Sequence, residues 1–217
     1  MSASLSATGK ETTKTGGKQS LLDSTKATST PKVSRVVWTD VRVRPFAIAD
    51  ADSMLDYFFQ GIHADLNRQI LEFVKFADAA SCRSYLVELV TQPALMPIVT
   101  IELKGRTIGT HWLDGMVGTQ ADFQGAFWNS QDRGKGIGTI SWFKACEYFF
   151  KTYAYDTFRF RVARENTVAI GLAKKLPLNF IGEEAGVAGM VRIFTVTREE
   201  FENMSSNEVE DTDDSDI

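Results

Sequence analysis

The stretch Gln131-Asp132-Arg133-Gly134-Lys135-Gly136-Ile137-Gly138 lies between a strand-like segment, 120–128, and an apolar run, 139–153. The local order is therefore strand, glycine-rich loop, helix. The first N–H groups of a helix have no intrahelical partners and carry partial positive charge, so such a junction binds anions. The glycines let the backbone approach a ligand closely, and Arg133 and Lys135 add full charges. The stretch predicts a site for a phosphorylated ligand.

The spacing of the glycines excludes two common phosphate sites. A nucleoside-triphosphatase loop requires Gly-x-x-x-x-Gly-Lys-Ser/Thr, and no such Lys-Ser/Thr pair follows Gly134. A dinucleotide fingerprint requires Gly-x-Gly-x-x-Gly early in a βαβ unit, whereas these glycines are two residues apart and occur late in the chain. The stretch instead resembles the Gln/Arg-x-x-Gly-x-Gly/Ala loop of the GNAT acyltransferases, matched by Gln131, Gly134 and Gly136. The simplest alternative is a turn that only lets a helix pack closely on a sheet.

The resemblance to the GNAT family implies acetyl-coenzyme A as cosubstrate. In that family the loop amides hold the pyrophosphate, which assigns this role to Gln131, Arg133, Gly134, Lys135, Gly136, Ile137 and Gly138. The family's fourth strand offers a backbone N–H to the acetyl oxygen, and the matching residues are Ala126, Phe127 and Trp128. Residues 164–169 resemble the family's Asn-x-x-Ser/Ala signature, whose Asn, here Asn166, contacts the pantetheine arm.

Apolar periodicity along the chain agrees with this resemblance. The expected strands are 36–44, 97–103, 107–113, 120–128, 157–162, 180–183 and 191–196, with 114–119 as a loop. Helices are expected after Asp50, over 65–90 with a break near Asp78, over 139–153, and over 166–176. The resemblance covers about 40–198 and implies the GNAT fold. This is an α/β (α+β) architecture, in which a mixed, mostly antiparallel sheet of six to seven strands is flanked by about four helices. Residues 105–110 and 125–128 are similar to the matching segments in the branch of the family that acetylates ribosomal-protein N-termini.

The chain of 217 residues suits one domain with tails, and its composition is ordinary. No apolar run approaches the roughly 18 residues that would cross a bilayer, and no signal peptide is recognisable. The two cysteines, Cys82 and Cys146, have no metal-ligand spacing to each other or to the histidines, so no metal site is expected. A cytoplasmic protein with reduced thiols is predicted.

The net charge of −4 conceals a strong asymmetry between the two ends. Residues 1–35 carry six basic and two acidic side chains, and their first 30 positions include six serines and seven threonines. Residues 199–217 carry nine carboxylates and no basic side chain. This pattern predicts a disordered basic arm over 1–35 and a disordered acidic tail over 199–217, and the resemblance implies a GNAT domain over 36–198 between them. The tails are interpreted as solvated extensions, with no specific nucleic-acid partner; the acidic one could also attract a basic acceptor.

Acetyl transfer from a thioester to an amine requires a deprotonated amine, a donor for the oxyanion and a proton for the leaving thiolate. Glu165 and His111 rank first as general bases. Many GNAT enzymes place a Tyr seven residues after the signature Asn, and this chain has Ala173 there. Either another residue protonates the thiolate, or solvent does, or the chemistry has been lost.

Two hypotheses follow. The first is an acetyl-CoA-dependent N-acetyltransferase in which a primary amine, from a protein N-terminus or a small molecule, attacks directly in a ternary complex. Many relatives of this kind pair as homodimers. The second is a catalytically impaired GNAT-like domain that acts as a binding or assembly protein, as similar folds encoded among phage structural genes do.

Overall fold

The computed structural model describes residues 36–59, 78–186 and 189–210, with side chains to 204 in the last range. The predicted basic arm, the part of the expected helix before residue 78 and the last seven residues of the predicted acidic tail lie outside these ranges.

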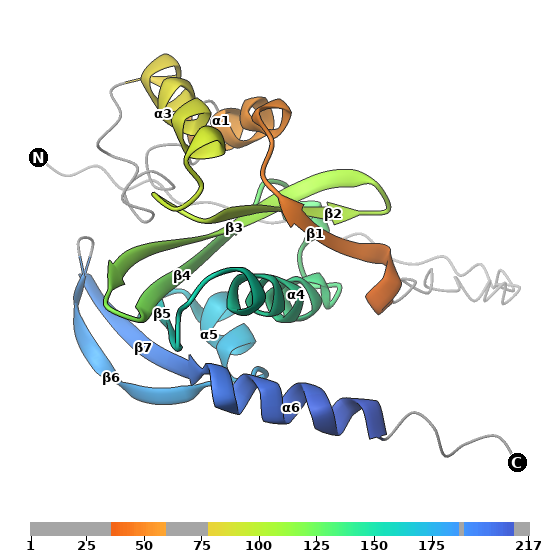
Figure 1. Ribbon diagram of the computed structural model, residues 1–217, viewed down its shortest axis with the longest axis vertical. Helices are drawn as coiled ribbons and strands as arrows, with labels where there is room; N and C mark the ends of the chain where they lie inside the picture. Colours follow the sequence, from red (N-terminus) through yellow and green to blue (C-terminus); the bar gives the residue numbers. More distant parts are fainter. Residues whose placement is uncertain (1–35, 60–77, 187–188, 211–217) are drawn as a thin grey trace, which may run out of the picture. The chain divides into compact units, whose positions relative to one another are not determined.

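A seven-stranded sheet forms the centre of the described domain (Figure 1). Its strands are β1 (Val41–Pro45), β2 (Ile98–Leu103), β3 (Arg106–Val117), β4 (Gln120–Phe127), β5 (Thr157–Ala163), β6 (Asn179–Gly186) and β7 (Gly189–Thr197). They lie in the order β1-β2-β3-β4-β5-β7-β6. The β4–β5 pair is parallel and the others are antiparallel. The predicted fold class, a mixed and mostly antiparallel sheet, is confirmed.

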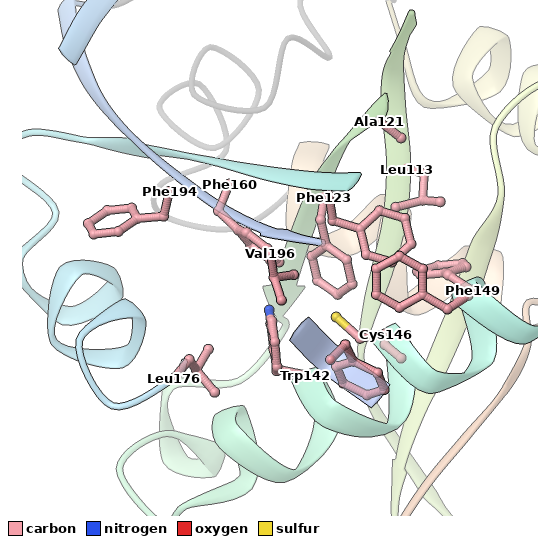
Figure 2. Close-up of a cluster of buried hydrophobic side chains, with 14 of the residues drawn as sticks. Leu113, Ala121, Phe123, Trp142, Cys146, Phe149, Phe160, Leu176, Phe194 and Val196 are labelled. Carbon is pink, nitrogen blue, oxygen red and sulfur yellow. The ribbon is translucent and has the colours of Figure 1, made fainter. Parts of the chain in front are cut away.

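Helices cover both faces of this sheet (Figure 1). Within the described ranges they are α1 (Ala51–Phe59), α3 (Ala79–Thr91), α4 (Ile137–Thr152), α5 (Thr167–Ala173) and α6 (Arg198–Glu210). Apolar side chains of α1 and α3 pack against Trp112 and Ala126 on one face. Those of α4 pack against Phe123 and Phe158 on the other face, in the cluster drawn in Figure 2.

Local sequence explains where two of these helices lie. The Asp78 carboxylate accepts a hydrogen bond from the Ser81 N–H at 2.7 Å, so α3 begins where the sequence predicted a break. Helix α4 is apolar around much of its circumference because it is covered on two sides. The Phe149 ring packs edge-on against Phe123 of the sheet, and the Phe150 ring lies 5.5 Å from Phe201 of α6.

The prediction of a disordered tail from residue 199 is wrong as far as residue 210, because α6 occupies this segment. Phe201 is buried in the apolar cluster around α4, called the main core below, and anchors α6. The Arg198 guanidinium donates to the carbonyl oxygens of Tyr153 and Tyr155 at 3.0 and 2.6 Å. Glu199 and Glu200 stand in the first turn, where the helix dipole favours negative charge. The acidic composition therefore suits a helix start.

Two strand boundaries also differ from the prediction. Residues 114–117 of the expected loop belong to β3, and only Gly118 and Thr119 form the turn, with Gly118 at φ +61°. The Asp114 carboxylate is satisfied within the strand because it accepts from the Trp112 indole at 3.1 Å. The first strand begins at Val41, after a 3₁₀ turn over Trp38–Asp40. Among the residues with described structure, no helix is both long and apolar enough to cross a membrane.

Candidate functional site

Strands β4 and β5 diverge and open a cleft in the sheet. They are paired only at 120/157, 121/158 and 122/159, although β4 continues to Phe127 and β5 to Ala163. The cleft has a volume of about 1680 Å³. Its lining includes Tyr57 and Tyr85 from the α1–α3 side and Leu172 from α5. The cleft is therefore accessible to groups from both faces of the sheet.

An ion-pair network closes the floor of the cleft, where the two strands meet. Asp122 is buried and accepts from the Arg159 guanidinium at 2.6 and 3.1 Å. Its hydrogen bond raises the pKa of Arg159 above the ordinary value. Arg161 lies 3.8 Å from Asp122 and donates to Glu184 at 2.9 Å. These charges are engaged with one another, so the floor is held by side chains.

The glycine-rich loop forms the mouth of the cleft and is held by three local devices. Gly134 and Gly136 have φ of +76° and +82°, which disfavours any residue with a Cβ. The Asn129 side chain accepts from the Gln131 N–H at 2.9 Å. Asp132 is buried and accepts from Arg106 of β3 at 2.6 and 3.1 Å. Gly136 is the N-cap of α4, so the first amides of a 16-residue helix are presented at this mouth.

The structure divides the predicted loop residues into two groups. Arg133, Gly134, Gly136 and Gly138 line the cleft, and Arg133 also donates to the Phe127 carbonyl at 3.2 Å. The other three lie outside the lining: Gln131 is exposed, Lys135 is half-buried and Ile137 is buried in an apolar cluster. The side chain of Ile137 is thus a core contact.

Only some backbone amides of β4 face the cleft. The Trp128 N–H donates to Ile108 of β3 at 3.0 Å. Because amides alternate in direction along a strand, that of Ala126 also points to β3, and those of Phe127 and Gly125 point to the side where β5 diverges. The expectation for Ala126 and Trp128 is therefore corrected. Gly125 was missed, since its direction depends on the register with β3.

Gly125 is a glycine because His111 lies against it. A Cβ at Gly125 would be 2.2 Å from the His111 Nδ1 atom. The His111 Nδ1–H donates to the Gln124 carbonyl at 3.3 Å, and its Nε2 lies 3.1 Å from the Ser141 hydroxyl, which is also 3.2 Å from the Gly138 carbonyl oxygen. Burial lowers the pKa of His111 to about 4. His111 lines the cleft as predicted, but it is poorly suited to act as the general base, because its Nδ1 already carries a proton and its low pKa means that Nε2 binds a proton weakly.

The turn after β5 separates the other two predicted residues. Glu165 is exposed and outside the lining of the cleft, so it is not placed to act as the base. Asn166 does line the cleft. Its Oδ1 accepts from the Ala169 N–H at 3.0 Å and caps α5, which leaves the amide nitrogen of the side chain for a ligand. Ala173, at the end of α5, is buried in the main core and also lines the cleft.

Two tryptophans that line the cleft carry buried indole N–H groups without partners. They are Trp128 and Trp142, and no other side-chain nitrogen or oxygen in the described ranges is both buried and unsatisfied. Trp128 packs with the α1–α3 cluster and Trp142 with the α4 cluster. A buried donor without an acceptor is costly, so in a cleft each of these N–H groups is a candidate donor to a ligand or to water.

A mixed sheet that opens between two parallel strands, with a glycine-rich loop at a helix N-terminus, defines the fold of the GNAT acetyltransferases. Solved structures with this fold match the chain at low sequence identity. The aminoglycoside acetyltransferase AAC(6')-Ib in complex with coenzyme A and kanamycin matches with a TM-score of 0.62 and 16% identity, over 76% of this chain and 99% of that one.

Two further solved structures share the fold. Spermidine N-acetyltransferase from Vibrio cholerae, in complex with CoA and spermine, has a TM-score of 0.65 and 14% identity, over 76% of this chain and 99% of that one. Mycobacterium smegmatis RimJ, in complex with CoA-disulfide, has a TM-score of 0.59 and 16% identity, over 77% and 89% of the respective chains. No protein-family model and no curated protein sequence matches the chain.

Proposed function

We propose that this chain is an acetyl-CoA-dependent N-acetyltransferase that moves the acetyl group to a primary amine by direct attack in a ternary complex. One observation carries the proposal: the cleft between β4 and β5 has a helix N-terminus with two left-handed glycines at its mouth. The similar structures named above were solved with coenzyme A or CoA-disulfide bound.

The residues at the mouth fit a coenzyme with a pyrophosphate. The first N–H groups of α4 would donate to the phosphate oxygens, and the guanidinium of Arg133 and the ammonium of Lys135 add positive charge nearby. Along the wall, a Cβ at Gly171 of α5 would meet no atom within 4 Å. A helical glycine with open space beside it leaves room for the pantetheine arm, and the free amide nitrogen of Asn166 is a donor for it.

The chain contributes position and electrostatics to the transfer. The bound thioester supplies an activated acetyl carbonyl. The N–H groups of Gly125 and Phe127 face the open side of β4 and would donate to the oxygen of that carbonyl as it gains negative charge. Because His111 is engaged and Glu165 lies outside the cleft, we assign the removal of the amine proton to water in the cleft.

The acceptor half of the cleft, on the α1–α3 side, is aromatic and acidic. Tyr57, Tyr85 and Trp128 line it together with Asp56 and Asp114. Aromatic faces and carboxylates attract a protonated amine before it loses its proton. This wall is compatible with small amines and with protein N-termini. Cys82 and Cys146 are both buried, and neither forms a disulfide within the described residues, which is consistent with a cytoplasmic location with reduced thiols.

The thermal midpoint with and without acetyl-CoA tests the proposal. At about 100 times the dissociation constant, a ligand stabilises by about 2.7 kcal/mol, or several degrees for a domain of this size. The double variant Arg133→Glu, Gly134→Asp should lose this rise. Lys151→Glu, at the exposed C-terminal end of α4, reverses a charge on the same helix and should keep it. No rise in the wild-type protein would refute the proposal.

Ala173 favours a second candidate function, a GNAT-like domain that binds the coenzyme without turnover. Its buried methyl group can donate no proton to a leaving thiolate. Release of free coenzyme A, followed with a thiol reagent across polyamines, aminoglycosides and peptides with free N-termini, separates the two. Turnover above the rate of hydrolysis with any acceptor establishes the transferase, and coenzyme binding with no turnover across the panel favours the binding protein.

A further inference from the structure

Trp142 lies deep in the cleft, on the second turn of α4. Its side chain is only 2% exposed. Its ring centroid lies 5.5 Å from that of Phe160 and 6.4 Å from that of Phe123, the residues that directly follow the last β4–β5 pair. In Figure 2 the indole nitrogen points away from α4 toward the strands that carry these two rings. Trp142 therefore stands where the cleft closes.

The indole N–H of Trp142 has no acceptor within the described structure. Trp112 is buried to a similar degree, and its indole donates to Asp114 at 3.1 Å. The fold therefore provides an acceptor for the buried indole of Trp112 and none for that of Trp142. An indole N–H donates and never accepts, so the missing partner must be an acceptor atom.

The surroundings restrict which acceptor can reach this N–H. Phe123, Phe160, Ala173 and Leu176 form an apolar wall around the indole, and His111 has both ring nitrogens engaged. A linear ligand whose phosphate end is held at the mouth presents its opposite end to the closed end of the cleft. In coenzyme A that end is the sulfur.

We propose that the Trp142 Nε1–H donates a hydrogen bond to the sulfur of coenzyme A and stabilises the thiolate that leaves during transfer; this rests on the function proposed above. The amine nitrogen bonds to the acetyl carbon, the C–S bond breaks, and its electron pair goes to sulfur. The proton lost by the amine passes to water. The indole gives up no proton and acts only as a donor to negative charge.

Calorimetry with coenzyme A and desulfo-coenzyme A, which has hydrogen in place of the thiol, tests the assignment at a pH where the bound thiol ionises. The wild-type protein should bind coenzyme A about tenfold more tightly than the desulfo analogue, as expected for a hydrogen bond to a charged group. Trp142→Phe removes the N–H and keeps an aromatic ring, and should bind the two ligands equally. Trp128→Phe removes the other unpartnered indole, on the opposite face, and should keep the preference.

A measurement on the wild-type protein keeps the test independent of whether Trp142→Phe folds. The Trp142 indole N–H resonance should move downfield when coenzyme A binds and stay near its free position with the desulfo analogue. Equal shifts with both ligands would assign the N–H to the pantetheine arm and overturn the proposal, as would no shift with either bound ligand. If neither ligand binds the wild-type protein, the proposed function itself fails, and this assignment with it.

Discussion

The floor and the mouth of the cleft are held together in different ways. At the floor, the carboxylate of Asp122 and the guanidinium of Arg159 pair, and the tilted rings of Phe123 and Phe160 pack 4.9 Å apart on the other face of the same strands. At the mouth, the order is set by the left-handed glycines, Gly134 and Gly136, and by side chains that cap amides.

This contrast separates stability from binding. The charged and apolar side chains at the floor contact one another, so few of their polar or apolar groups are available to a ligand. The mouth leaves helix amides and an Asn amide unpaired, which costs stability unless a ligand or water accepts from them. Substitutions at the floor should therefore change the free energy of unfolding, and substitutions at the mouth should change ligand affinity.

Asp122→Ala should give the largest effect. The variant leaves Arg159 and Arg161 beside each other, partly buried, with Glu184 as their remaining carboxylate partner. Loss of one partner of a buried pair costs about 3 kcal/mol of unfolding free energy, measurable by urea denaturation. Asp52→Ala is the control, because its pair with Arg83 is at the surface and should contribute less than about 1 kcal/mol. Equal losses in both variants would show that the floor pair has no special role.

Gly125→Ala tests a residue that belongs to both regions, since its amide faces the cleft and its α-carbon faces His111. The new methyl would overlap the imidazole, and overpacking of this kind costs about 1 to 3 kcal/mol. His111→Ala in the same chain should restore part of the loss, which a thermal melt of the single and double variants measures. A double variant no more stable than Gly125→Ala would show that the clash is not with His111.

The stability should also depend on pH through His111. Its folded-state pKa of about 4 lies below the ordinary 6.5, so the unfolded chain takes up the proton first as the pH falls. The contribution is complete above pH 6.5 and is lost toward pH 4, by about 2 kcal/mol between pH 7 and pH 5. His111→Gln should lose this component in urea titrations at the two pH values. An unchanged pH dependence in the variant would place the titration elsewhere.

Sequence reasoning found the mouth because glycine spacing encodes backbone geometry directly. The positive φ angles of Gly134 and Gly136 are local properties, and a glycine-rich loop before an apolar run identifies them without knowledge of the rest of the fold. The positions of the strands followed from apolar periodicity, which is also a local property, whereas their assembly into a mixed sheet was implied by the resemblance to the GNAT family. The start of α3 after Asp78 was likewise predictable, because it depends on local capping.

The features that sequence reasoning missed depend on contacts between distant residues. The acidic segment after Arg198 is helical because Phe201 reaches the core and Arg198 reaches the end of α4, more than 40 residues earlier. The engaged state of His111 needs Ser141, 30 residues away. Which amides of β4 face the cleft follows from the register with β3. None of these has a signature in a short stretch of sequence.

Gly171→Ala should give the smallest effect on stability, and it should change stability and coenzyme affinity in opposite directions. Gly171 is helical, and a Cβ there meets nothing within 4 Å, so alanine should raise the unfolding free energy by about 0.5 to 1 kcal/mol. Because the residue lines the cleft, the same methyl occupies space assigned to the coenzyme, and acetyl-CoA should bind several-fold more weakly in calorimetry. Gly118→Ala is the control. A Cβ at Gly118 also meets no atom within 4 Å, but this residue has φ +61°, so alanine should destabilise the fold and leave the affinity for acetyl-CoA unchanged. If Gly171→Ala is more stable but binds acetyl-CoA with wild-type affinity, the coenzyme does not bind against α5 at Gly171.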